Sequence, residues 1–70
     1  MVEKTIELTG TSTSSIEEAV NVAIGRAAVT IQNLRRFRVK EIRGVVENGV
    51  VAQWHVTIDL SFVVTERVHE

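Results

Sequence analysis

The feature that most limits the possible folds is a run of alternating residues from Val50 to Val64. Side chains of a β-strand point alternately to the two faces of a sheet, so period two predicts a strand with one buried face. The strand would be about 50 Å long at roughly 3.3 Å per residue, which exceeds what a lone three-stranded sheet needs. We therefore expect it to bend or to continue into a neighbouring molecule. Its even, apolar positions are Val50, Ala52, Trp54, Val56, Ile58, Leu60, Phe62 and Val64.

A second strand is expected over residues 37–46. Phe37 and Val39 share one phase of the alternation, but Ile42 has the other. A bulge or a change of exposure near Lys40–Glu41 would explain this slip, because one extra residue reverses the facing of all that follow.

The turns and the first strand complete the β-structure. Glu47-Asn48-Gly49 predicts a hairpin, since Asn-Gly accepts the positive φ angles that tight hairpin turns require. Residues 2–9 also alternate, with Ile6 and Leu8 in the apolar phase, and this predicts a half-buried strand that Gly10 ends.

Between the first two strands the period changes to that of a helix. Hydroxyl side chains precede it, and either Ser14 with Glu17 or Ser15 with Glu18 makes a capping box. Apolar residues then recur in steps of three and four, so one amphipathic helix is expected to end near Asn33. The expected inner face consists of Ile16, Ala19, Val20, Ala23, Ile24, Ala27, Ile31 and Leu34.

The opposite face of this helix carries Val22, Gly25 and Val29. Single valines are common on protein surfaces. A fully solvated helix face, however, rarely needs two valines and a glycine. This face is therefore either ordinary surface or a contact with another subunit.

These elements predict an α+β fold of β-α-β-β order in one domain, residues 1–70. The helical crossover makes the first two strands parallel, and the hairpin returns the third between them. We therefore expect an antiparallel sheet of order 1-3-2 packed on one helix. A 70-residue chain without cysteine has a small core and no disulfides, so assembly into an oligomer is the expected source of further stability.

Charge and composition exclude several functions. The net charge is −1, and aromatic residues are too few to stack on bases, which argues against nucleic-acid binding. The sequence has neither a membrane-length apolar run nor the pattern of a signal peptide, so a cytoplasmic location without membrane contact is expected. A local basic cluster remains, and it is either a charged edge strand or an anion site. It comprises Arg35, Arg36, Arg38, Lys40 and Arg43.

No catalytic motif is evident, so the chain is not expected to be an enzyme. His55 and Asp59 share a face but lie about 13 Å apart along an extended strand, too far for an acid–base pair. Trp54 lies in the apolar phase and is expected in the core. Gln53 and His55 lie on the polar face of the central strand, which could line a pocket.

The sequence resembles the dodecins along nearly its whole length. No single match is unique, but their order and spacing together are fairly specific. The matching positions are Leu8-Thr9-Gly10-Thr11-Ser12, Ile16-Glu17-Glu18-Ala19, Arg26-Ala27-Ala28, Leu34, Phe37 to Val39, Glu41-Ile42-Arg43-Gly44, Val51-Ala52, Trp54, Val56-Thr57 and Phe62. The resemblance implies a hollow homo-dodecamer that binds FMN, riboflavin or a related flavin for storage or protection.

The departures from the dodecin pattern fall at the implied flavin site. A tryptophan that stacks on the flavin usually precedes the Phe37 position, where this chain has Arg36. A glutamine usually follows the aromatic at position 54, where this chain has His55, and an arginine often stands where it has Val63. Arg43 matches the arginine on the phosphate side. The resemblance thus implies cofactor-binding roles for Arg36, Arg43 and His55. Gln53, which lies beside His55 on the polar face, is the fourth expected cofactor-binding residue. A shell that binds another phosphate-bearing ligand or a metal, or that is purely structural, is the alternative.

Overall fold

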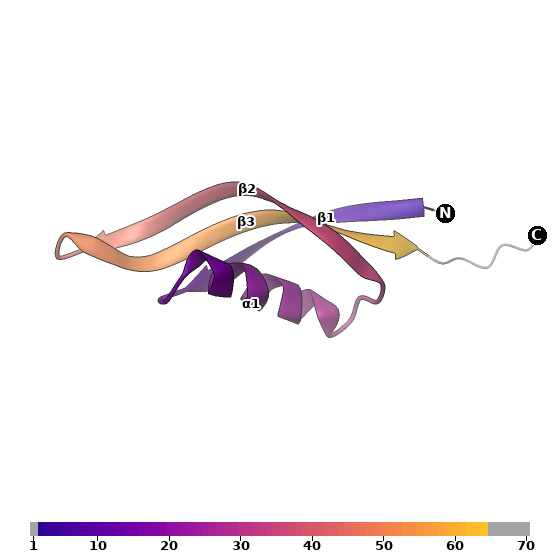
Figure 1. Cartoon of the computed structure of the whole chain (residues 1–70), viewed down its shortest axis with the longest axis horizontal. Helices are drawn as coiled ribbons and strands as arrows, with labels where there is room; N and C mark the ends of the chain where they lie inside the picture. Colours follow the sequence, from indigo (N-terminus) through magenta and orange to yellow (C-terminus); the bar gives the residue numbers. More distant parts are fainter. Residues whose placement is uncertain (1, 65–70) are drawn as a thin grey trace, which may run out of the picture.

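The computed structural model describes residues 2–64 and contains one helix and one three-stranded sheet. The elements follow the order β1 (Val2–Ser12), α1 (Ile16–Ala28), β2 (Leu34–Glu47) and β3 (Val50–Val64). β3 lies between β1 and β2 and is antiparallel to both. Figure 1 shows the resulting elongated subunit, with the helix along one side of the sheet. The predicted β-α-β-β order and the strand order 1-3-2 are confirmed.

The core lies between α1 and the apolar face of β3. Val56, Ile58 and Leu60, in the even phase predicted to be apolar, are fully buried beneath the helix. The helix contributes mostly small residues to this contact, so it approaches the sheet closely. Its buried residues are Ala19, Val20, Ala23 and Ala27.

The start of α1 uses one of the two predicted capping arrangements. Ser15 is the N-cap, and its Oγ accepts a hydrogen bond from the backbone N–H of Glu18 at 3.0 Å. The Glu18 side chain does not close the box. Its Oε1 accepts instead from the Ser12 hydroxyl at 2.9 Å, and that hydroxyl oxygen accepts from the backbone N–H of Ser14. The loop between β1 and α1 is therefore held by its own hydroxyls.

The prediction that the helix continues to near Asn33 is wrong. The helix ends at Ala28, and the N–H groups of Thr30 and Ile31 both donate to the Ala27 carbonyl oxygen. Asn33 then has a φ of 64°, a left-handed conformation that asparagine tolerates better than most residues. Ile31 packs against the core from the loop, and Leu34 does so from the start of β2. Their spacing therefore matches a helical pattern although both residues follow the end of the helix.

Gly10 does not end the first strand, contrary to the prediction. β1 continues to Ser12, and Gly10 is a buried member of it paired with Val56. A Cβ at position 10 would overlap the Ala19 carbonyl oxygen and lie 3.1 Å from the Ala23 Cβ. The glycine is therefore required by the close approach of α1 to β1.

β2 contains the predicted irregularity. Its pairing with β3 shifts register between Val39 and Glu41, and this shift brings Ile42 onto the face that carries Phe37 and Val39. The strand is longer than predicted, because it also includes residues 34–36 and 47. Asn48 and Gly49 form the expected turn, with φ angles of 53° and 78°.

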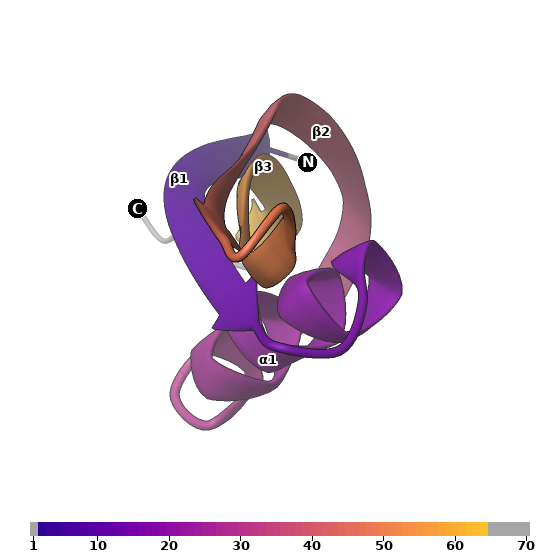
Figure 2. The same cartoon turned by 90° about the vertical axis from the view of Figure 1, so that its left-hand side faces the viewer.

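The helix covers the sheet unevenly. It packs against β1 and β3, while the apolar face of β2 stays open: Phe37 and Ile42 are each 48% exposed. In the end-on view of Figure 2 the sheet curls above the helix, with β1 and β2 on opposite sides of β3. Within residues 2–64, no helix has the length and apolar character needed to cross a bilayer.

Candidate functional site

Three of the four predicted site residues lie together on the polar face of the sheet. His55 and Gln53 follow each other on that face of β3, and His55 Nε2 lies 3.0 Å from Gln53 Oε1. Both side chains are half-buried. Arg43 of β2 is the register partner of His55 on one side, and Thr11 of β1 is its partner on the other. The sequence thus produces a row of polar groups across all three strands.

Arg36 lies far from this row within one chain. It is paired with Ser61, which follows His55 on β3 by six residues, or roughly 20 Å of extended strand. Its Nη2 lies 3.5 Å from Glu3 Oε2, and 72% of its side chain is exposed. One subunit therefore does not bring Arg36 to Arg43, His55 and Gln53.

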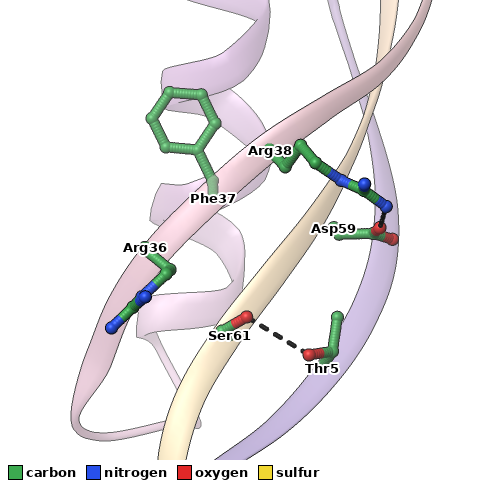
Figure 3. Close-up of a pocket in the computed structure, with 6 residues that line it drawn as sticks. All are labelled: Thr5, Arg36, Phe37, Arg38, Asp59 and Ser61. Carbon is green, nitrogen blue, oxygen red and sulfur yellow. Dashed lines mark hydrogen bonds and ion pairs between the residues drawn. The ribbon is translucent and has the colours of Figure 1, made fainter.

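A hollow of about 270 Å³ surrounds Arg36 at the edge of β2 (Figure 3). On its floor the hydroxyls of Thr5 and Ser61 lie 3.2 Å apart. Arg38 Nη2 donates to Asp59 Oδ2 at 2.8 Å, which directs that guanidinium across the sheet. Figure 3 shows the Arg36 side chain directed away from this pair.

The residues that join Arg36 in this hollow were not predicted. The sequence pattern did not give the register of the strands. β3 separates β1 from β2, so Thr5 and Arg36 are brought near each other because both pair with Ser61. Their shared alternation phase was visible in the sequence, but the pairing partners were not.

Four members of the predicted basic cluster have an acidic partner. The pairs are Arg36–Glu3, Arg38–Asp59, Lys40–Glu7 and Arg43–Glu41. Most of these side chains are well exposed, so each pair contributes little to stability. An incoming anion must compete with the acids. The arrangement favours a charged, protected edge strand over a general anion-binding surface.

Within this cluster, Lys40 has a raised pKa. Its Nζ donates to Glu7 Oε1 at 2.9 Å. This hydrogen bond, followed by the negative charges of Glu7 and Asp59, raises the pKa of Lys40 above its ordinary value of 10.5. Lys40 is therefore a cation throughout the physiological range.

The two titratable side chains of β3 on the polar face, His55 and Asp59, are held apart by different neighbours. Asp59 is engaged by Arg38, and His55 contacts Gln53, so these two side chains have separate partners. No cluster of three or more His, Cys, Asp or Glu side chains in residues 2–64 could hold a metal ion. Trp54, predicted to be in the core, packs against it but is only partly buried.

Comparison with known proteins gives a consistent result. The family model described as Dodecin matches residues 2–65. A dodecin of Thermus thermophilus is 39% identical over 61 residues, which cover 87% of this chain and 88% of the relative. The structure of the Streptomyces coelicolor dodecin superposes with a TM-score of 0.87 at 36% identity, covering 94% of each chain.

A more distant structure is also similar. The calcium dodecin of Mycobacterium tuberculosis, described as a calcium-chelating immunodominant antigen with a novel calcium-binding site, has a TM-score of 0.79 at 28% identity and covers 100% of both chains. The family model spans every described helix and strand. The chain belongs to the dodecin family.

Proposed function

We propose that this chain assembles into a hollow homo-dodecamer that binds flavin, FMN or riboflavin, for storage or protection rather than turnover. The observation that carries the proposal is the family match over residues 2–65. The short chain, without cysteine, adds to it, because such a subunit gains stability from assembly. A cytoplasmic location is part of the same proposal.

The flavin site would be shared between subunits. Arg36, Arg43, His55 and Gln53 are the proposed ligands, yet Arg36 lies roughly 20 Å along the sheet from His55. A pocket that contains all four needs Arg36 from one copy and the other three from another. The hollow at Arg36 would then be the part of the site that each subunit contributes at its β2 edge.

Arg36 would change which flavin the site prefers and how tightly it binds. Its guanidinium is planar and can stack on an aromatic ring, but a cation stacks less favourably on the electron-poor flavin than a neutral, electron-rich indole would. It also attracts the phosphate of FMN. The Glu3 carboxylate 3.5 Å away weakens that attraction, because the phosphate must displace it or share the cation. We therefore expect weak flavin binding with FMN preferred over riboflavin.

The remaining residues would contact the polar parts of the ligand. Imidazole and amide groups both donate and accept hydrogen bonds, so His55 and Gln53 suit the edge of the flavin ring. Their mutual contact at 3.0 Å fixes their orientation before the ligand arrives. Arg43, the register partner of His55, would lie toward the phosphate.

The alternative is a dodecin-like shell that no longer binds flavin. It would bind another phosphate-bearing ligand, hold a metal, or be purely structural. Of these three possibilities, the structure favours a phosphate-bearing ligand, since the Arg36 guanidinium lies in the same hollow as the Thr5 and Ser61 hydroxyls.

The test combines native mass spectrometry with flavin titration. Mass spectrometry of the wild-type protein gives the number of subunits and the mass of any bound ligand. Fluorescence titration with FMN and riboflavin, at low and high salt, gives the affinities. We expect the FMN preference to shrink at high salt, because screening acts on charge and hardly on stacking.

An Arg36→Trp variant should strengthen riboflavin binding and deepen the quenching of its fluorescence. Arg35→Trp, the same change at the adjacent exposed position, is the matched control and should leave both unchanged. If the wild type binds neither flavin and Arg36→Trp gains nothing, the flavin proposal is wrong. Inorganic phosphate and FMN competing equally for the wild type would favour the alternative.

A further inference from the structure

The turn between β2 and β3 places an asparagine directly before a glycine. Asn48 and Gly49 are both exposed, and their φ angles are 53° and 78°. The pairing of the two strands ends with Glu47 opposite Val50. The backbone N–H of Gly49 therefore takes no part in the hydrogen-bond ladder of the sheet, although it directly follows the residue that carries the side-chain amide.

This arrangement brings together the two groups of an intramolecular reaction. The Gly49 backbone nitrogen attacks Cγ of Asn48, and the new carbon–nitrogen bond closes a succinimide ring. The bond from Cγ to Nδ2 breaks, and ammonia leaves with the proton of the attacking nitrogen. Water then opens the ring, which gives aspartate when the bond at Cγ is cleaved and isoaspartate when the bond at the backbone carbonyl carbon is cleaved. No oxidation or reduction is involved.

The glycine leaves the attacking nitrogen unhindered. It has no Cβ, and its conformational freedom allows the peptide group to rotate toward the geometry of ring closure. A Cβ placed at position 49 would meet no atom of the described residues within 4 Å. Neither the attack nor the later addition of water is therefore obstructed by the rest of the described subunit.

The end of the hairpin also has little support within the subunit. β1 ends at Ser12, opposite Trp54, so residues 45–53 have no third strand beside them. We call this segment the hairpin tip, and Figure 1 shows it projecting past the start of α1. Two-stranded hairpins are at best marginally stable in water, so the tip should open locally at small cost. Each opening frees Asn48 to close the ring.

The other two asparagines of the chain lack this combination. Asn33 is exposed and has a similar φ of 64°, but its carbonyl oxygen accepts from the Val63 N–H at 3.1 Å, and Leu34 follows it at the start of β2. Asn21 lies within α1 and precedes a valine. At both positions a branched side chain hinders the attacking nitrogen, and the backbone is held in place by hydrogen bonds.

We propose that Asn48 is a site of spontaneous modification, at which the folded protein converts its own hairpin turn to aspartate and isoaspartate. Aspartate adds a negative charge beside Glu47 and tolerates the positive φ as asparagine does. Isoaspartate carries the main chain through its Cβ, so the loop between Glu47 and Val50 is lengthened and their pairing is lost. The modification therefore distinguishes old chains from new ones and loosens the hairpin tip, independently of any flavin ligand.

Peptide mass spectrometry of the purified, assembled protein tests the proposal. Trypsin cleaves after lysine and arginine, and this separates the asparagines. The peptides 5–26, 27–35 and 44–67 contain Asn21, Asn33 and Asn48 respectively. Samples incubated for increasing times are digested, and each peptide is followed for the mass increase that accompanies exchange of an amide for a carboxyl group. A methyltransferase specific for isoaspartate measures that product separately.

We expect Asn48 to convert first, about a hundredfold faster than Asn21 or more, because Asn21 reacts only when α1 unfolds. A hundredfold ratio corresponds to about 2.8 kcal/mol, which is less than the free energy of unfolding expected for a chain of this size. Equal rates at Asn33 and Asn48 would overturn the proposal. It would also be overturned if Asn48 stayed intact in the folded protein while the urea-unfolded chain converted.

Two variants test the assignment and the mechanism. Asn48→Gly removes the amide and keeps a residue that accepts a positive φ. Its 44–67 peptide should keep its mass, which excludes Gln53, the other amide of that peptide. Gly49→Asp adds a Cβ in open space, and aspartate tolerates the left-handed conformation, so conversion of Asn48 should slow. Conversion at the wild-type rate in Gly49→Asp, or a mass increase in Asn48→Gly, would contradict the proposal.

Discussion

Replacing Gly10 with alanine tests whether the close approach of α1 to β1 determines the stability of this subunit. The new Cβ would overlap the Ala19 carbonyl oxygen, a backbone atom of the helix that cannot rotate aside. It would also lie 3.1 Å from the Ala23 Cβ. The contact is relieved only if helix and strand separate, which opens the alanine-lined core beneath Ile58.

The expected cost follows from these contacts. Overpacking a close-packed core costs about 1–3 kcal/mol and occasionally more, and a clash with backbone belongs at the upper end. A chain of this size has a free energy of unfolding on the order of 3.5–10 kcal/mol. A loss of about 3 kcal/mol would lower the melting temperature by roughly 12–24 °C.

Gly25→Ala is the matched control, because an added Cβ there meets nothing within 4 Å. Alanine is favoured over glycine inside a helix by about 0.5–1 kcal/mol, so this variant should melt at or above the wild-type temperature. Circular dichroism melts at one protein concentration give the comparison, since oligomer stability depends on concentration. A Gly10→Ala protein that melts within about 4 °C of wild type, the shift for 1 kcal/mol, would refute the reasoning.

Three further changes test other parts of the molecule. Gly25→Arg should reduce the size of the assembly on a sizing column if the outer helix face contacts another subunit; an unchanged size and melting temperature would assign that face to solvent. Trp54→Ala should cost less than the roughly 3–5 kcal/mol typical of a fully buried tryptophan, because Trp54 is only partly buried in one subunit; urea unfolding measures this, and a larger loss would mean that a neighbouring subunit completes its burial. Lys40 should titrate above 10.5 by NMR, and Glu7→Gln should lower its pKa toward that value. Because the pKa of Lys40 is raised in the folded state, the Lys40–Glu7 contact contributes its full stabilisation of the fold at pH values below the ordinary pKa. This contribution is lost as the pH rises through the pKa of the folded state. An unchanged Lys40 pKa in the Glu7→Gln variant would show that Glu7 does not raise it.

Most of the fold followed from periodicity, and the errors have identifiable physical causes. The long alternation of β3 and the phase slip of β2 led directly to the sheet and its bulge. The helix end was misplaced because Ile31 and Leu34 pack on the same core from outside the helix. Gly10 was predicted to end the strand because the sequence does not show why a glycine is needed there. The reason is that the Ala19 carbonyl oxygen, on the helix, leaves no room for a Cβ at position 10.

The site was less accessible to sequence reasoning. Gln53, His55 and Arg43 were expected to share a site, and strand register does bring them together. The neighbours of Arg36 depend on pairing across β3, which alternation alone does not give. The ligand roles of these residues stay predictions, because the proposed site would be divided between subunits, and the pattern of one chain does not give such a site.

The strand order has a consequence for how the chain is made. β3 is the last strand to be synthesised, yet it lies in the middle of the sheet and supplies the buried centre of the core. Val2 pairs with Val64, so β1 has no partner until β3 has been translated. Such distant pairing is slow compared with local contacts. The nascent subunit therefore cannot complete its fold while β3 is still inside the ribosome, and assembly should follow the emergence of that strand.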